Sequence, residues 1–286
     1  MSQSGIPKLE IGKAVDAAVS WLSTNLEWFF DGISWIIDVI VSVIIAVVGF
    51  FPPIVIILLV FVLAWRVVNR GTAILAGLGL FIVWNIGFWD DTVLTFALVF
   101  TATFIAIIFG IPLGIWAARS DRVEAVMKPI LDFMQTMPAF VYLIPAVFFF
   151  GTGSVPGILA SVVFAMPPTI RMTNLGIRQV PVEMIEAADA FGATARQKLF
   201  GVQLPLARPT IMAGLNQSIM LSLSMVVIGA MIGARGLGAA IYRSVTQIQV
   251  GLGFEAGLAV VVLAIVLDRL TQSLGRSKRR PRGEDE

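Results

Sequence analysis

Apolar stretches of about the length needed to cross a bilayer alternate with short polar connections along most of this 286-residue chain. About 20 apolar residues in helical form cross the hydrocarbon core, so each stretch predicts a transmembrane helix. Seven segments qualify: Pro53–Val68, Thr72–Phe88, Thr92–Ala117, Phe133–Phe150, Val155–Met172, Pro209–Ile232 and Phe254–Gln272. The predicted fold class is therefore all-α, a polytopic membrane protein with about seven transmembrane helices and an N-terminal amphipathic helix.

The segment Ile33–Phe51, ahead of these seven, is also apolar enough to span a membrane. Small and polar residues recur there every three or four positions, which places them on one stripe of a helix. They are Asp31, Ser34, Asp38, Ser42, Ala46 and Gly49. Such a stripe is typical of a helix lying on the membrane surface, or of an extra span packed through small residues. We favour the surface helix, because no Lys or Arg lies nearby to anchor an inner end, and we assign residues 1–52 to this N-terminal part.

The composition is that of a membrane protein. Hydrophobic residues make up 58% of the chain, charged residues 13%, and the mean hydropathy is +0.92, whereas soluble domains have about 25% charged residues. The chain contains no cysteine and no histidine, which excludes disulfides, thiolate nucleophiles, imidazole bases and the common zinc sites. No paired acids lie at one depth of the predicted membrane domain, so the sequence does not indicate an enzyme.

The basic residues gather on one side of the predicted topology. If the polar connection 179–208 lies in the cytoplasm, most Lys and Arg residues fall inside, as the positive-inside rule requires. They are Arg66, Arg70, Arg119, Arg122, Lys128, Arg171, Arg178, Arg196, Lys198, Arg208, Arg269, Arg276, Lys278, Arg279, Arg280 and Arg282, whereas Lys8, Lys13, Arg235 and Arg243 fall outside. We therefore expect an external N-terminus, a membrane domain over 53–274 and a basic cytoplasmic tail over 275–286.

A polar island, Glu186–Pro205, separates two long apolar runs. Pro181 and the acidic residues that follow favour the start of a helix, because negative charge complements the N-terminal end of the helix dipole. Gly192 can take the left-handed conformation that ends a helix, and Thr194 can cap a second short helix. The acidic residues of the first helix are Glu183, Glu186 and Asp189, and the basic residues of the second are Arg196 and Lys198. Leu204–Pro205 is expected to stop this segment before the next span.

The first of these short helices carries an apolar edge. Ile185, Ala188 and Phe191 recur at a spacing of three and share one side of the helix. A short helix with one apolar edge and charged flanks suits a groove on a soluble partner protein. The alternative is an ordinary amphipathic cytoplasmic loop.

Six residues of this loop resemble the EAA motif of ABC importer permeases, including the long gap after the glycine. They are Glu186, Ala187, Ala188, Gly192, Leu204 and Pro205, while Val202 stands where that family commonly has Ile. In that family the loop is the coupling helix that seats in a cleft of the ATPase subunit. The resemblance implies that these six residues couple the chain to an ATPase, and that the fold is of the type I ABC importer class.

Four further segments resemble the glycine betaine/proline betaine permeases of this family. They are Asp132–Pro145, Asn216–Val227, Met231–Gly238 and Gly251–Asp268. The resemblance implies a permease of the bacterial cytoplasmic (inner) membrane that imports osmoprotecting methylated amines: glycine betaine, proline betaine, carnitine, choline or trimethylamine N-oxide. It implies a complex of two copies of the permease, two ATPase subunits and a periplasmic or extracellular solute-binding protein. It also implies that ATP and Mg are bound by the ATPase, and that this chain holds no cofactor or metal.

The position of ionisable residues along the predicted spans distinguishes an ATP-driven importer from an ion-coupled carrier. A proton- or sodium-coupled carrier usually places ionisable groups at mid-membrane, whereas the acidic residues here lie near span ends. These are Asp90, Asp91, Glu255 and Asp268. The chain has no glycine-lysine P-loop, so a partner would have to bind the nucleotide. The alternatives that stay open are an ABC permease for another small solute, such as methionine or a sulfonate, and a secondary transporter or channel.

Polar and aromatic residues inside otherwise apolar spans are candidates for lining a translocation path. They are Met134, Gln135, Met137, Phe140 and Tyr142 in the fourth predicted span, and Asn216, Met220 and Ser224 in the sixth. Aromatic rings can pass a quaternary ammonium by weak cation–π contact. The three residues of the sixth span share a face, and Ser218 and Ser222 lie roughly opposite, so one face is expected to meet the path and the other a neighbouring helix. The alternative is that all of them pack between helices.

Prolines and glycines mark breaks and close contacts in the predicted spans. Pro112 lies between Gly110 and Gly114, where we expect a kink and a close helix contact. Pro138 and Pro145 are expected to interrupt the fourth span, and Pro167–Pro168 lie near the end of the fifth. The external segment Gly233–Gly253, in which Arg235 stands where relatives commonly have glycine, is expected to form a loop or short helix under the binding protein.

Overall fold

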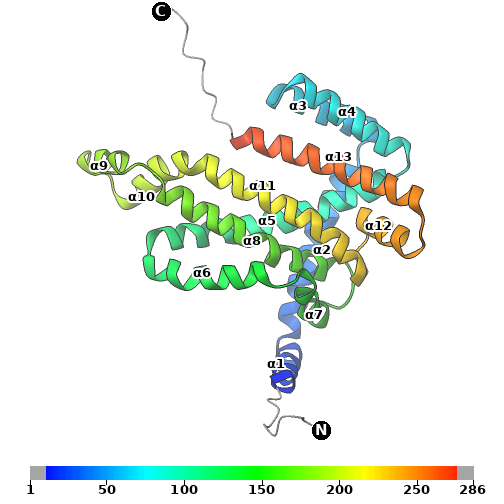
Figure 1. The fold of residues 1–286 in the computed structure, drawn as a ribbon, viewed down its shortest axis with the longest axis horizontal. Coiled ribbons are helices and arrows are strands. Elements are labelled where there is room, and N and C mark those ends of the chain that lie inside the picture. Colours follow the sequence, from blue (N-terminus) through cyan, green and yellow to red (C-terminus); the bar gives the residue numbers. More distant parts are fainter. Residues whose placement is uncertain (1–10, 276–286) are drawn as a thin grey trace, which may run out of the picture.

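The computed structural model describes residues 11–275, and this part of the chain is made of helices joined by short turns (Figure 1). The helices are α1 (Ile11–Asn25), α2 (Glu27–Gly49), α3 (Pro53–Val67), α4 (Arg70–Asn85), α5 (Trp89–Arg119), α6 (Asp121–Thr136), α7 (Ala139–Phe150), α8 (Ser154–Arg178), α9 (Val182–Ala190), α10 (Ala195–Lys198), α11 (Leu204–Gly229), α12 (Leu237–Thr246) and α13 (Val250–Gly275). A π-helical segment, η1 (Leu199–Gln203), joins α10 to α11, and a 3-10 segment, η2 (Ala230–Ile232), follows α11. The predicted all-α fold class is confirmed, while most of the predicted tail lies outside the described residues.

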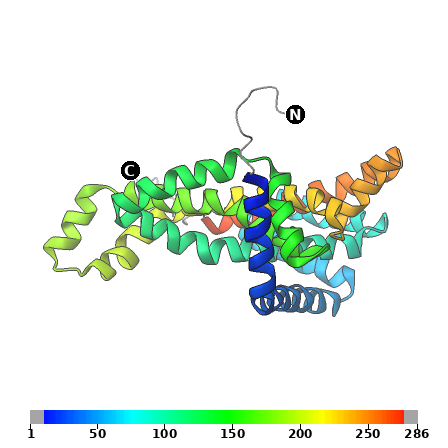
Figure 2. The ribbon, with the colours of Figure 1, turned by 90° about the horizontal axis from the view of Figure 1, so that it is seen from below.

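The centre of the molecule is a bundle in which α8 packs along both α5 and α11, with α13 beside α11 (Figures 1 and 2). Glycines bring α5 and α8 close together. A Cβ on Gly110 would lie 2.9 Å from Thr169 Cγ2, and one on Gly114 would lie 2.5 Å from Thr173 Cβ and 2.8 Å from the Ile170 carbonyl oxygen. Small residues that let helix backbones approach are typical of membrane helix pairs. The close contact expected around Pro112 is therefore present, although α5 continues through the proline.

By length and composition, five helices of the described residues are able to cross a membrane, or six if one bent pair is counted as a span. Helices α3 and α4 fall below this length, with 15 and 16 residues. At 1.5 Å per residue each is about 23 Å long, less than the hydrocarbon thickness of about 30 Å. They form a hairpin beside α13, and the Asn69 side chain caps α4 by accepting a hydrogen bond from the Thr72 amide at 2.8 Å. The helices predicted over Pro53–Val68 and Thr72–Phe88 therefore exist but are short.

The span predicted over Phe133–Phe150 is interrupted at Pro138, as expected, and its two parts belong to helices of different direction. Helices α6 and α7 meet at Met137–Pro138 with an angle of 95° between them. Proline disfavours the helical conformation of the residue before it and has no amide hydrogen to donate, so Met137 is extended and Pro138 starts a new helix. Pro145, by contrast, lies inside α7, and Pro167–Pro168 lie inside α8, without ending either helix.

Helix α2 contains most of the ambiguous segment Ile33–Phe51 and runs across the direction of α8, α11 and α13 (Figure 1). Its 23 residues are long and apolar enough to form a span. Only Ile37 and Val41 are buried along it. A helix that crosses the spans at a large angle lies closer to the plane of the membrane than to its normal, so this direction supports the surface interpretation.

Candidate functional site

The polar island forms a projection at one end of the bundle, made of α9, α10 and η1 (Figures 1 and 2). Two predicted features build it. Gly192 has φ +73°, the left-handed conformation, just after α9. Thr194 and Gln197 then form a capping box for α10: the Thr194 amide donates to Gln197 Oε1 at 2.8 Å, and the Gln197 amide donates to Thr194 Oγ1 at 3.4 Å. The glycine and the cap together direct α10 back toward the bundle.

This projection is called the coupling loop below and comprises residues 179–208. An ion pair and a buried apolar contact stabilise its arrangement. Lys198 Nζ lies 2.6 Å from Asp189 Oδ1, which ties α10 to α9. Leu199 is buried in a small apolar cluster with Ile177 of α8 and Ala207 of α11. Helix α9 itself has no buried residue, so the coupling loop is anchored at its second half and presents its first half to solvent.

The exposed apolar surface of the coupling loop differs from the edge expected at Ile185, Ala188 and Phe191. Ile185 and Ala188 are half-buried, whereas Phe191 is 92% exposed. Phe191 lies just past the end of α9, so helical spacing no longer places it beside the other two. The exposed large apolar side chains of this loop are Val182, Met184, Phe191, Phe200 and Leu206.

The six motif residues occupy different environments within the coupling loop. Glu186, Ala187 and Gly192 are exposed, and Ala188 is half-buried. Leu204 packs against the cluster that holds Leu199, and Pro205 is exposed in the first turn of α11. The expectation that Leu204–Pro205 stops the segment is wrong. Proline is tolerated in the first turn of a helix, and α10, η1 and α11 follow one another without a break.

Of the predicted path residues, Asn216 and Tyr142 donate hydrogen bonds to a different helix. Asn216 Nδ2 donates to Asp268 Oδ1 of α13 at 2.6 Å, and Gln272 Nε2 donates to the same oxygen at 2.7 Å. The Tyr142 hydroxyl donates to the Met134 carbonyl oxygen at 2.5 Å across the bend between α6 and α7. Asn216 therefore joins two helices, which supports the packing alternative for this residue.

The other six candidate path residues differ in how exposed their side chains are. Gln135, Phe140 and Ser224 are exposed, and Met134, Met137 and Met220 are half-buried. The opposite face of α11 is buried, as expected: Ser218 Oγ lies 2.7 Å from Thr169 Oγ1 of α8, and Ser222 accepts a hydrogen bond from Thr103 of α5 at 3.4 Å. The assignment of these six residues to a path stays a prediction.

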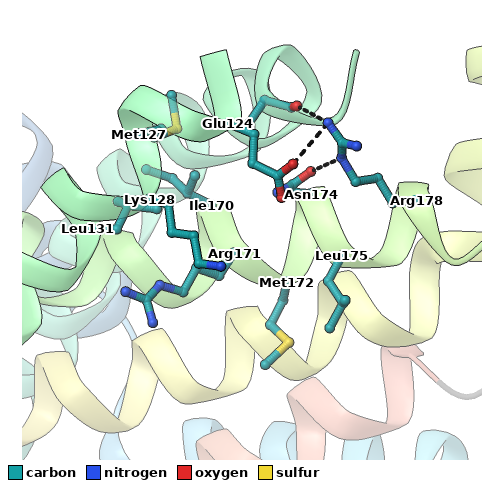
Figure 3. A pocket seen from close by; sticks show the side chains of 11 residues that line it. Glu124, Met127, Lys128, Leu131, Ile170, Arg171, Met172, Asn174, Leu175 and Arg178 are labelled. Atoms are coloured by element: carbon teal, nitrogen blue, oxygen red, sulfur yellow. Dashed lines mark hydrogen bonds and ion pairs between the residues drawn. The ribbon is translucent and has the colours of Figure 1, made fainter. Parts of the chain in front are cut away.

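A pocket of about 290 Å³ lies between α6 and α8, near the coupling-loop end of the bundle (Figure 3). Arg178 crosses it, with Nη2 2.8 Å from Asp121 Oδ1, 3.1 Å from Glu124 Oε2 and 3.0 Å from the Ala117 carbonyl oxygen. Arg171 forms a second ion pair with Asp132. This network was not predicted from the sequence. Its signal is a set of acids on α6 with a matching set of basic residues on one face of α8.

Residues 110–280, from α5 through the coupling loop and into the tail, match the family of binding-protein-dependent transport system inner membrane components. The chain belongs to this family of transport permeases.

The permease is similar to curated relatives over nearly its whole length. It is 51% identical over 278 residues to the glycine betaine transport system permease protein OpuAB of Bacillus subtilis (strain 168), covering 97% of this chain and 98% of that one. It is 55% identical to the glycine betaine/carnitine transport permease protein GbuB of Listeria monocytogenes serotype 1/2a (strain 10403S), covering 95% and 97%. The family and the relatives consist of transport subunits, so this chain is a permease and not an enzyme.

Solved structures support the fold of the permease. The MetNI methionine ABC transporter, in an inward-facing conformation, matches with a TM-score of 0.56 and 23% identity, over 68% of this chain and 93% of that chain. This likeness concerns the arrangement of helices alone. It confirms the type I ABC importer architecture implied by the EAA motif.

The ion pairs around Arg178 lead to a prediction about how α6 is held. We expect Arg178→Gln to loosen the first turns of α6 in the permease, because the change removes contacts to Asp121, Glu124 and Ala117 together. The groups are partly exposed, so the loss is expected to be about 1 kcal/mol or less. Hydrogen exchange of residues 121–130 measures it. Asp121→Asn is the control, because Asp121 is 90% exposed and its loss leaves the other two contacts intact; equal exchange in both variants would contradict the prediction.

Proposed function

We propose that this permease is the membrane-spanning subunit of an ATP-driven importer of glycine betaine, proline betaine and related methylated amines. The observation that carries the proposal is the similarity to OpuAB and GbuB over at least 95% of this chain, at 51% and 55% identity. The permease protein ProW of Escherichia coli (strain K12), named for glycine betaine/proline betaine transport, is 46% identical over 93% of this chain and 75% of that protein. The names of these three relatives agree in the substrate class.

The partners in the proposal are two ATPase subunits, a second copy of the permease and an external solute-binding protein. ATP and Mg are bound by the ATPase, which contacts the six motif residues and the exposed apolar side chains of the coupling loop. The coupling loop lies in the cytoplasm, the N-terminus outside and the tail 275–286 inside. The short helix α12, within the segment expected to be external, faces the binding protein.

The path in this proposal runs along the exposed faces of α6, α7 and α11 between two copies of the permease. Gln135, Phe140 and Ser224 contact the substrate on the way, and Phe140 offers an aromatic face to the quaternary ammonium. Met134, Met137 and Met220 lie beside them as flexible apolar walls. Binding that is weak at each point allows the substrate to leave as well as enter.

The proposed function is tested by uptake into vesicles. The permease is reconstituted with its ATPase, and the vesicles are supplied with the binding protein and radiolabelled glycine betaine. We expect uptake that requires ATP on the side of the membrane where the ATPase is bound. We also expect excess unlabelled proline betaine to inhibit this uptake. Concentrative uptake by the permease alone, driven by an ion gradient, would overturn the proposal. Uptake of methionine in preference to the betaines would overturn the substrate class.

Phe191 gives a test of the proposed ATPase contact. The side chain is 92% exposed, so Phe191→Asp is expected to leave the fold of the permease intact. A charge placed at the centre of an apolar docking site typically costs 2 kcal/mol or more in binding, so we expect ATPase affinity to fall at least about tenfold. Co-purification of the ATPase with the tagged permease measures the change.

The control for this test is Val245→Asp. Val245 is an exposed apolar residue of α12, away from the coupling loop, so the same charge is added without touching the proposed ATPase contact. If the ATPase co-purifies normally with the Phe191→Asp variant, Phe191 does not take part in the proposed contact.

A further inference from the structure

A groove on the side of the bundle is lined by apolar side chains from five helices. It lies where the α3–α4 hairpin meets α5 and α13, with the end of α2 at its rim, and its volume is about 300 Å³. Representative lining residues are Ile56, Leu59 and Leu63 of α3, Phe96 of α5, and Leu263 and Leu267 of α13. Thr92 also lines the groove, and its hydroxyl donates to the Phe88 carbonyl oxygen at 2.7 Å. Apart from this bonded hydroxyl and the indole N–H of Trp89, the side chains that line the groove carry no hydrogen-bonding group.

The size and lining of this groove suit a hydrocarbon chain. An apolar cavity of about 150 Å³ stays free of water and takes an apolar ligand, and this groove is about twice as large. Its length along α3, from Ile56 to Leu63, is about 10 Å at 1.5 Å per residue. The surrounding side chains of α3 are themselves exposed and apolar, among them Leu58 and Val62, so the groove opens toward the surface that lipid covers.

One end of the groove leads to a group of basic residues. Helices α3 and α13 both run toward the turn between α3 and α4, where Val68 and Asn69 line a small hollow with Arg269. Arg66 lies in the last turn of α3 and Arg70 opens α4, on either side of the same turn. Leu63 and Leu270, which line the groove, lie within one turn of Arg66 and Arg269.

These three arginines have no acidic partner among residues 11–275. The neighbouring carboxylate, Asp268, already accepts hydrogen bonds from Asn216 and Gln272. Arg70 lies over the Trp65 ring, 6.0 Å from its centre, which leaves its charge available. Positive charge at the end of an apolar groove complements an anionic head attached to a hydrocarbon tail.

We propose that this groove is a binding site for an anionic phospholipid from the leaflet on the coupling-loop side. One acyl chain lies along α3 and α13, and the phosphate contacts Arg269, Arg66 and Arg70 around the α3–α4 turn. The lipid completes the packing between a hairpin too short to span the bilayer and the central bundle. The site does not depend on the proposed substrate or on the ATPase.

The test is lipid retention by the purified full-length permease, measured by native mass spectrometry after incubation with mixed micelles of phosphatidylglycerol and phosphatidylcholine. We expect one phosphatidylglycerol to be retained in preference to phosphatidylcholine. Arg269→Gln is expected to lower its affinity about fivefold, the effect of one basic residue near a lipid surface. Arg235→Gln, which removes an exposed arginine elsewhere on the molecule, is expected to leave retention unchanged.

A matched pair of variants tests the groove itself. Leu59 lines the groove and is 57% exposed, whereas its neighbour Leu58 is 56% exposed and lies outside it. Leu59→Trp is expected to fill the groove and reduce phosphatidylglycerol retention at least about fivefold, and Leu58→Trp to leave it unchanged. Equal retention in this pair overturns the proposal. So does equal retention of the two lipids, or a crosslink that places a second copy of the chain or its own terminal residues at position 59.

Discussion

Replacing Gly114 with valine is expected to prevent the permease from reaching a stable fold. A Cβ at this position would lie 2.5 Å from Thr173 Cβ and 2.8 Å from the Ile170 carbonyl oxygen. The carbonyl oxygen belongs to the backbone of α8 and cannot turn aside as a side-chain tip can. Helices α5 and α8 would have to separate along their contact, so we expect a loss of about 3 kcal/mol or more. Natural proteins are stable by only about 5–15 kcal/mol, so most of the protein should be lost during expression.

The yield of monodisperse permease in detergent and its thermal unfolding temperature measure this effect. The control is Gly257→Val, the same change inside α13, where an added Cβ meets nothing within 4 Å. Both variants make the same change in helix propensity, so their difference isolates the contact between α5 and α8. If the two variants unfold at the same temperature, the close contact at Gly114 is not needed.

Replacing Gly192 with valine is expected to reduce ATP-driven uptake at least about tenfold while leaving the membrane domain folded. Gly192 has φ +73°, where a β-branched residue is a strained outlier. The strain of one or two kcal/mol is relieved if α9 changes its direction relative to α10. Because α9 has no buried residue to resist this change, the surface offered to the ATPase moves, and a misplaced docking surface loses much of its binding energy.

Uptake and ATP hydrolysis, measured on the same vesicles, check this prediction. Gly201→Val is the control, because Gly201 also has nothing within 4 Å of an added Cβ, but its φ is not positive. Gly192→Asp should be affected less than Gly192→Val, since Asp tolerates the left-handed conformation better. Normal uptake by Gly192→Val would show that the direction of α9 does not matter for coupling.

Features of this permease that depend on local chemistry were predictable from the sequence. The long apolar runs became α5, α8, α11 and α13, because hydrocarbon thickness sets their length. Gly192 and Thr194 were expected to end one helix and cap the next, and both do so. In each case the physical reason lies within a few residues of the position itself.

Features that depend on partners distant in the sequence were missed. Nothing near Asn216 in the chain indicates that its side chain meets Asp268, 52 residues away. The ion pairs of Arg171 and Arg178 hold α6 against α8, and nothing near either arginine in the chain indicates its partner. Pro138 indicated a break in the apolar run Phe133–Phe150, but hydropathy carries no information about the angle of 95° between α6 and α7.

The unbroken run of α10, η1 and α11 has a mechanical consequence. Residues Ala195–Ile232 form 38 consecutive helical residues, a rod of about 57 Å at 1.5 Å per residue. One tip of this rod belongs to the coupling loop and the other adjoins the turn before α12. The rod is in tight contact with α8 near Gly214, so we expect a sideways displacement at the loop to be carried along the backbone to the far tip.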